Sequence, residues 1–235
     1  MNTLALKWIA LLSMTTDHLV YVLYQNEWIS ESFYLIGRCL GRLAFPIYLY
    51  LLLIGLYKTH NRLQYFLRLL CFAVLSEIPY NLFRNGTISF FKEQNVFFLL
   101  CTAFLLYRYL QKIEEQKWKP VLQSLISIIA IIVFAFWSSI LRFDYGWFGI
   151  LLATVFYYAH KQKDKTKSGF IFLTGMSIIL PFEMAFHNVM AIFILFAIPL
   201  FLFTKEKKIV VPKPVRLLFY LYYPVHLALL RVLLK

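Results

Sequence analysis

The chain has 235 residues, of which 61% are hydrophobic and 19% aromatic, and its mean hydropathy is +0.70. A soluble domain is about half apolar, so this composition excludes a soluble protein and predicts an all-α, polytopic helix bundle, with residues 1–235 as one integral membrane domain in a lipid bilayer. The net charge of +13 would suggest nucleic acid as the partner of a soluble protein, but the loop charges of a membrane protein explain it without one.

About nine segments are apolar enough to form transmembrane helices. A helix rises 1.5 Å per residue and the hydrocarbon core is roughly 30 Å thick, so a span needs about 20 residues. Several segments fall short of that length and are expected to be tilted or partial. The predicted helices cover residues 4–24, 35–57, 64–83, 95–110, 121–141, 146–160, 169–186, 188–203 and 216–234.

The charged residues of the loops orient these helices. The first connection, residues 25–33, carries Glu27 and Glu31 and no base. This asymmetry predicts a cytoplasmic N-terminus and an external C-terminus. A role for one basic loop in binding nucleotide phosphate stays open as an alternative. The opposite connections are poor in basic residues and carry only Arg84, Lys92 and Arg142. Most basic residues of the loops lie on the alternate connections: Lys58 and Arg62; Arg108, Lys112, Lys117 and Lys119; Lys161, Lys163, Lys165 and Lys167; and Lys205, Lys207, Lys208, Lys213 and Arg216.

The first predicted helix contains two adjacent ionisable residues, Asp17 and His18. An ionisable residue at the centre of a span costs about 2.5–3.5 kcal/mol or more, so it usually faces a protein interior or a wet cavity. A carboxylate beside an imidazole can hold a histidine in the tautomer needed for proton transfer. The alternative is a polar cluster that only packs helices together.

Further polar residues fall in the outer halves of other predicted helices, whereas the inner halves are poor in them, with Arg68 as the main exception. Ionisable groups that converge at one depth from separate helices indicate a site. A structural ion network, with the arginines neutralising the carboxylates, is the alternative. These outer residues are Arg38, Arg42, Glu77, Asn81, Asn95, Asp144, Tyr145, Glu183, His187, Tyr223 and His226.

The residue types limit the chemistry of such a site. No metal site is predicted, because the five histidines are isolated from one another in the sequence. The sequence also lacks a glycine-rich phosphate loop and a Gly-x-Ser-x-Gly elbow. Acid–base catalysis by a histidine, with arginines as electrostatic partners, remains.

Six short motifs stand out along the chain: Ser13-Met-Thr-Thr-Asp17-His18, Gly41-Arg-Leu-Ala-Phe-Pro-Ile47, Ser76-Glu-Ile-Pro-Tyr80, Asn95-Val-Phe-Phe98, Asp144-Tyr-Gly146 and Tyr223-Pro-Val-His226. Together they resemble the TraX family of bacterial inner-membrane proteins, in the family's order and over nearly the whole chain. The type member acetylates the N-terminal amine of conjugative pilin, with acetyl-CoA as the expected donor. The family is similar, more distantly, to multi-span acyltransferases whose catalytic base is a histidine near the end of an early helix.

The resemblance implies an acetyltransferase of the bacterial cytoplasmic membrane with acetyl-CoA as donor and a pilin-like N-terminus or a cell-surface peptide or glycan as acceptor. His18 would be the general base, oriented by Asp17 or Glu77. Arg42, with Arg38, would stabilise the oxyanion or hold donor phosphate. The substrate would further contact Asn81, Asn95, Tyr145, Tyr223 and His226.

Two other functions stay open. A proton-coupled transporter also uses intramembrane Asp, His and Arg, although no internal repeat is evident and the polar set does not continue to the inner face. A non-catalytic assembly subunit would pair off its outer polar residues completely and leave no cavity.

Overall fold

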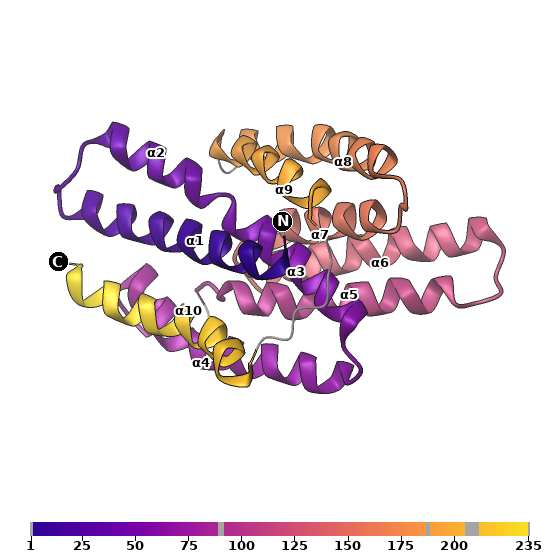
Figure 1. The fold of residues 1–235 in the computed structure, drawn as a ribbon, viewed down its shortest axis with the longest axis horizontal. Helices are drawn as coiled ribbons and strands as arrows, with labels where there is room; N and C mark the ends of the chain where they lie inside the picture. Colours follow the sequence, from indigo (N-terminus) through magenta and orange to yellow (C-terminus); the bar gives the residue numbers. More distant parts are fainter. Residues whose placement is uncertain (1, 89–91, 187–188, 205–211, 235) are drawn as a thin grey trace.

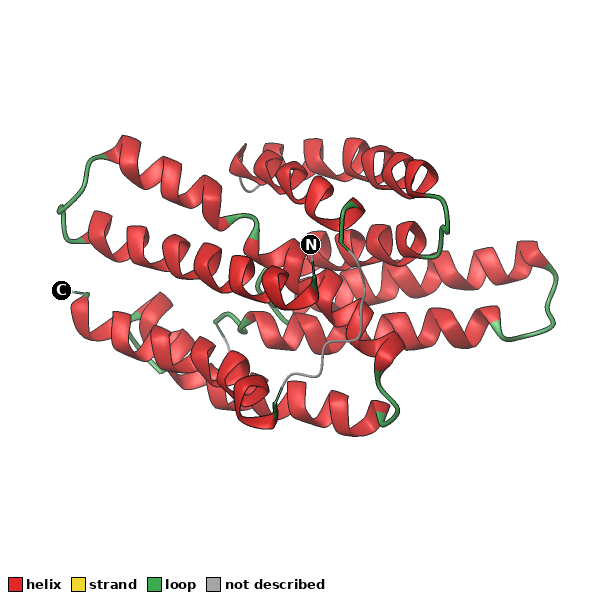
Figure 2. Cartoon of the chain, in the orientation of Figure 1, coloured by secondary structure: helices red, strands yellow, loops and turns green. Residues whose placement is uncertain are grey.

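The computed structural model describes residues 2–88, 92–186, 189–204 and 212–234 (Figure 1). Regular structure in this part of the chain is helical, with one isolated bridge between Gln94 and Phe143 (Figure 2). The elements are α1 (Thr3–Gln25), α2 (Glu31–Gly41), α3 (Ala44–Lys58), α4 (Arg62–Asn85), α5 (Val96–Glu114), α6 (Pro120–Ile140), α7 (Gly146–His160), α8 (Lys165–Phe186), the 3-10 helix η1 (Val189–Ala197), α9 (Ile198–Leu202) and α10 (Lys213–Leu233).

Six helical stretches of the described chain are long and apolar enough to cross a membrane, and the protein is a polytopic, all-helical membrane protein. The first stretch joins α2 and α3, and the others are α4, α5, α6, α8 and α10. Helix α6 is the most exposed of them, with side chains such as Val121 (72% exposed) and Phe136 (65%) suited to lipid. The other predicted segments correspond to α1, α7 and η1 with α9, whose crossing of the membrane stays a prediction.

The predicted helix over residues 35–57 is broken at Arg42 and Leu43, between α2 and α3. Pro46 lies in the first turn of α3. The N–H groups of a first turn have no hydrogen-bond partner within the helix, so the N–H that proline lacks is not needed there. The hydroxyl of Ser13 donates to the carbonyls of Leu40 (2.6 Å) and Gly41 (3.2 Å), which end α2. Helix α1 therefore stabilises the end of α2 at the break through these hydrogen bonds.

The predicted helix over residues 188–203 also differs, because η1 is a 3-10 helix and only the five residues of α9 are α-helical. Pro199 stands at the start of α9, where it cannot donate a hydrogen bond back into the preceding turn. His187 and the basic residues Lys205, Lys207 and Lys208 lie outside the described residues.

Five helices form a closed ring. Helix α1 packs on α3, α3 on α5, α5 on α4, α4 on α10, and α10 returns to α1 (Figure 1). Helices α6, α7 and α8 pack outside this ring, with α7 against both α3 and α5. One end of the bundle carries connections 26–30 and 141–145, and we call it the His18 end. The other end carries connections 59–61, 115–119 and 161–164, and we call it the basic end.

Candidate active site

At the His18 end of the ring, two histidines from α1 and α10 are hydrogen-bonded. Nδ1 of His18 lies 2.7 Å from Nε2 of His226, and the rings stack with centroids 5.0 Å apart. Nδ1 of His226 in turn lies 2.8 Å from the carbonyl oxygen of Tyr222. The hydroxyl of Tyr222 is 2.6 Å from that of Thr15, which further ties α10 to α1.

This chain of hydrogen bonds fixes the tautomers of the neutral rings. A carbonyl only accepts, so His226 must carry its proton on Nδ1 and accept at Nε2. His18 must then donate from Nδ1, which leaves the lone pair of a neutral His18 on Nε2. Within the described residues Nε2 of His18 has no hydrogen-bond partner. A neutral His18 is thus held with one accepting nitrogen, Nε2, available.

Asp17 points away from this pair and toward α2. Its Oδ2 accepts a hydrogen bond of 2.6 Å from Nη1 of Arg38, and both side chains are more than four-fifths buried. Oδ1 of Asp17 is buried with no partner among the described atoms. A Cβ on Gly41 would lie 2.2 Å from this Oδ1, so only glycine allows the carboxylate so close to α2.

Arg42, at the break between α2 and α3, contacts the loop before α7. A side-chain hydrogen bond joins its guanidinium to Tyr145, while its Nε is buried without a partner among the described atoms. Tyr145 has a positive φ of 66°, an unfavourable conformation for a residue with a side chain, and its ring stacks on Phe45 at 3.8 Å. Strain of this kind is held only where surrounding contacts impose it, and it often marks functional sites.

Asp144 brings a second carboxylate to the same region. Burial raises the pKa of the Asp144 carboxyl to about 6, an effect that the guanidinium groups of Arg84 and Arg42 oppose. The backbone holds this loop in place, because Gln94 donates to the carbonyl of Arg142 and accepts from the N–H of Asp144, both at 2.9 Å. Arg38, Arg84 and Arg42 all lie within electrostatic range of His18.

Glu77 forms a separate triad with two asparagines. Asn81 donates to its Oε1 (2.7 Å) and Asn95 to its Oε2 (2.6 Å), and all three side chains are at most 3% exposed. The second proton of the Asn95 amide goes to the carbonyl of Ala73, and its oxygen caps α5 by accepting from the N–H of Phe97. The triad therefore fastens the start of α5 to α4.

The structure thus divides the predicted site residues into groups. His18 and His226 form one pair and Asp17 and Arg38 another, with Arg42 and Tyr145 beside the second. No hydrogen bond or ion pair among the described residues joins His18 to Asp17 or Glu77, and the imidazole is oriented by His226. The hydrogen bonding of Glu77, Asn81 and Asn95 favours a role in holding helices. Their predicted catalytic and substrate-binding roles have no support in these contacts.

Tyr223 lies between this site and a large cavity in the ring. Its ring is 6.5 Å from that of His18, and its side chain also lines a cavity of about 600 Å³. Met14, one helical turn before His18, lines the same cavity, which extends to Lys58 and His60 at the basic end. The cavity therefore runs from the basic end to within one side chain, that of Tyr223, of His18.

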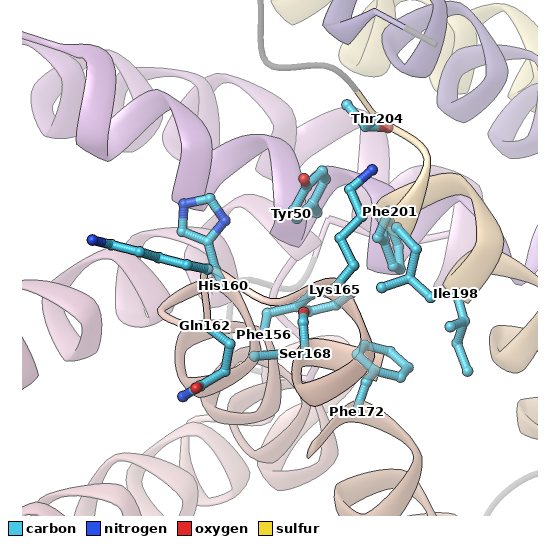
Figure 3. A pocket seen from close by; sticks show the side chains of 13 residues that line it. Tyr50, Phe156, His160, Gln162, Lys165, Ser168, Phe172, Ile198, Phe201 and Thr204 are labelled. Carbon is cyan, nitrogen blue, oxygen red and sulfur yellow. The ribbon is translucent and has the colours of Figure 1, made fainter. Parts of the chain in front are cut away.

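A second, smaller cavity of about 190 Å³ lies between α3, α7, α8 and α9 (Figure 3). Tyr50, His160 and Lys165 are among the side chains around it. It contains none of the predicted site residues, so we place no chemistry there.

Several residues that matter here were not predicted as site residues. The backbone carbonyl of Tyr222, which sets the tautomers, carries no sequence signal. Lys7, Arg68 and Arg216 line the large cavity. Arg68 was conspicuous as a cation in the inner half of a predicted helix and Arg216 as part of a basic connection, whereas Lys7 carried no signal.

Comparisons with known proteins show which family the chain belongs to. The chain is 26% identical over 240 residues to the "Probable fimbrial assembly protein FimC, serogroup H1" of Dichelobacter nodosus, in an alignment that covers 96% of this chain and 92% of that protein. No solved structure matches the chain significantly. The family model described as "TraX protein" matches residues 3–234. The chain therefore belongs to the TraX family.

Proposed function

We propose that this protein is a membrane-embedded acetyltransferase that moves the acetyl group of acetyl-CoA to an amine or hydroxyl of an extracytoplasmic acceptor. The observation that carries the proposal is the relay from Tyr222 through His226 to His18, which leaves the base nitrogen of His18 available. A well-placed general base typically contributes about 10²–10⁴ in rate.

In this mechanism Nε2 of His18 takes the proton of the acceptor N–H or O–H as the acceptor atom attacks the thioester carbonyl. The carbonyl π electrons move to oxygen and form a tetrahedral oxyanion. Arg42 and Arg38 supply positive charge for this oxyanion, and a stabilising donor of that kind is typically worth about 10²–10³ in rate. When the oxyanion collapses, the C–S bond breaks and His18 returns its proton to the thiolate.

The remaining predicted residues act by positioning in this proposal. Asp17 holds Arg38, and Tyr145 holds Arg42. Glu77 keeps the start of α5 beside α4 through Asn81 and Asn95. Tyr223 separates the donor side from the acceptor side. We assign no metal to this chemistry.

The acceptor is proposed from the relatives. The TraX family is known for pilin N-acetylation, and a relative over nearly the full chain is named as a fimbrial assembly protein. A pilin-like N-terminus or another cell-surface peptide or glycan is therefore the proposed acceptor. The proposed location is the bacterial cytoplasmic membrane, with nine helical segments and a cytoplasmic N-terminus, supported by the positive charge of the alternate connections.

Two observations favour an enzyme over a non-catalytic assembly subunit. An assembly subunit should pair off its buried polar groups, yet Oδ1 of Asp17, Nε of Arg42 and Oγ of Ser76 are buried without partners among the described atoms. The ring also encloses a cavity of about 600 Å³, a volume typical of sites for small ligands.

The test is His18→Gln in cells that lack the native copy, because glutamine keeps hydrogen bonding but cannot take a proton. Mass spectrometry of surface peptides and glycans should show an acetylated product with the wild-type protein and little with the variant. His160→Gln, which changes a histidine beside the smaller cavity, is the matched control and should retain activity. A wild-type level of acetylated product with His18→Gln would remove this histidine from the mechanism.

A further inference from the structure

The large cavity has a cationic mouth. Lys7, Arg68 and Arg216 line it from α1, α4 and α10, and none of the described residues that line it is acidic. Lys7 and Arg216 lie within electrostatic range of each other, and none of the three cations forms an ion pair with a described carboxylate. Like charges gathered in this way are unfavourable unless an anion joins them.

The backbone adds to this positive potential. Helices α1, α4 and α10 all begin at the basic end, and residues from the first turns of each, Thr3, Gln64 and Arg216, line the mouth. The N-terminus of a helix carries a partial positive charge that favours anions. Three such ends, with Lys7, Arg68 and Arg216 and with Lys58 of α3 on the same cavity wall, suit a ligand with several phosphate charges.

The mouth also has aromatic walls. The guanidinium of Arg68 lies 5.9 Å from the ring centre of Tyr220 and forms a side-chain hydrogen bond with it, and Nζ of Lys7 lies 5.5 Å from the ring centre of Phe219. These contacts hold the two cations at the wall of the cavity.

Beyond the mouth the cavity becomes an apolar throat. Leu51, Leu100, Val96 and Phe97 line it together with Met14 and Tyr223. Lys7 and His18 are eleven residues apart on α1, which is roughly 16 Å along the helix axis. A linear arm that leaves the mouth can therefore reach Tyr223, next to His18.

From these features we infer that the cavity binds a phosphorylated, nucleotide-linked thioester, with its phosphates on Lys7, Arg68 and Arg216 and its linear arm in the throat below His18. This inference rests on the proposed function and deepens it, because it assigns the donor of acetyl transfer to a site and a side of the protein. An anionic lipid shares the chemistry of a phosphate group joined to a long chain, and the experiment distinguishes the two sources.

The first measurement is the equilibrium binding of coenzyme A to the purified full chain in phosphatidylcholine nanodiscs. Arg68→Gln and Arg216→Gln should each weaken binding by about tenfold or more, since each removes a charge-assisted hydrogen bond to phosphate. Lys7→Gln should also weaken it, and all three should reduce the salt dependence of binding. Lys117→Gln, an exposed lysine at the same end, is the matched control and should change the affinity little.

A second measurement separates the mouth from the throat. Leu51→Trp fills part of the throat, so it should weaken binding of coenzyme A but leave adenosine 3′,5′-bisphosphate, which has phosphates and no arm, nearly unaffected. Arg68→Gln should weaken both probes, and Arg68→Lys should recover part of the affinity. Each variant is first shown to be folded, by an elution volume in size-exclusion chromatography and a thermal unfolding temperature close to those of the wild-type protein.

The same titration with His18→Gln keeps this inference distinct from the proposed function. If His18→Gln binds coenzyme A with wild-type affinity but does not transfer acetyl, both the donor site and the proposed function are supported. If the wild-type protein binds coenzyme A but has no transferase activity, the donor site is supported and the proposed function is contradicted. Unchanged affinity in Lys7→Gln, Arg68→Gln and Arg216→Gln would overturn the site. The inference would also be overturned if the protein failed to bind coenzyme A but retained phosphatidylglycerol, and if Arg68→Gln lost that lipid. The cavity would then be a lipid site.

Discussion

Nδ1 of His18 and Nε2 of His226 lie 2.7 Å apart, although 208 residues separate them in the chain. The bond joins the first helix of the bundle to the last, and it decides which nitrogen of His18 can accept a proton. In the proposed function, the carboxylate that usually orients a catalytic histidine is replaced by a second histidine, which is anchored on a backbone carbonyl.

Replacing His226 should therefore lower the rate more than it weakens substrate binding. His226→Ala leaves Nδ1 of His18 without its acceptor, so the ring can adopt either tautomer or orientation. We expect kcat to fall about 10–10³-fold with little change in KM, by analogy with the orienting member of a catalytic triad.

Tyr222→Phe is the matched control for that measurement. It removes the hydroxyl that contacts Thr15 but keeps the carbonyl that accepts from His226. Its kcat should stay close to wild type. Equal losses in the two variants would show that the packing of α10 on α1, and not the tautomer of His18, sets the rate.

Gly41→Ala should disturb the Asp17–Arg38 pair. The added Cβ would lie 2.2 Å from Oδ1 and 2.3 Å from Cβ of Asp17, a contact that forces α1 and α2 apart. We expect a loss of about 1–3 kcal/mol in the free energy of unfolding, together with reduced transfer activity. Gly169→Ala, where the nearest atom is 3.4 Å away in Leu202, should change thermal stability much less. Equal stability of both variants would contradict the close approach.

The sequence predicted most helices within a few residues, because apolar length and loop charge are local properties. It also indicated polar groups gathered at one end of the bundle. The ion pair between Arg38 and Asp17 agrees with the predicted alternative of arginines that neutralise carboxylates. The hydrogen bond between His18 and His226 could not be predicted, because only helix packing brings these two residues together. The break at Arg42 depends on contacts with α1, and the cationic mouth combines residues from α1, α4 and α10 that are far apart in the chain.

Glu77→Gln tests whether this carboxylate is catalytic or structural. Both of its oxygens accept hydrogen bonds from amides, so the NH₂ group of glutamine would face the donor of Asn81 or Asn95. One buried donor would lose its partner at a cost of about 1–3 kcal/mol. We expect lower thermal stability and lower yield, with near-normal kcat per folded molecule. A normally stable variant without activity would support the predicted catalytic role of Glu77.

The raised pKa of Asp144 predicts a pH-dependent contribution to stability. Because its pKa is about 6 in the folded chain against an ordinary value of 3.8, the folded state binds more protons between these values. This contribution to the free energy of unfolding therefore decreases as the pH rises from about 4 to about 6. Thermal unfolding in detergent should show wild type losing stability relative to Asp144→Asn over this interval. Asp164→Asn, in an exposed loop, should follow wild type; a constant difference between wild type and Asp144→Asn would refute the prediction.

The last prediction concerns orientation, on which the donor site also depends. With a cytoplasmic N-terminus, the connection at residues 161–164 and the cationic mouth face the cytoplasm, where acetyl-CoA is made, while residues 26–30 face outward. Single cysteines, Asp164→Cys or Ser30→Cys, are introduced into a chain whose Cys39, Cys71 and Cys101 are replaced by alanine. In intact cells, or spheroplasts where an outer envelope intervenes, an impermeant thiol reagent should label only position 30, and permeabilised cells should label both. Labelling of position 164 alone would turn the mouth away from its proposed ligand and contradict both the topology and the donor route.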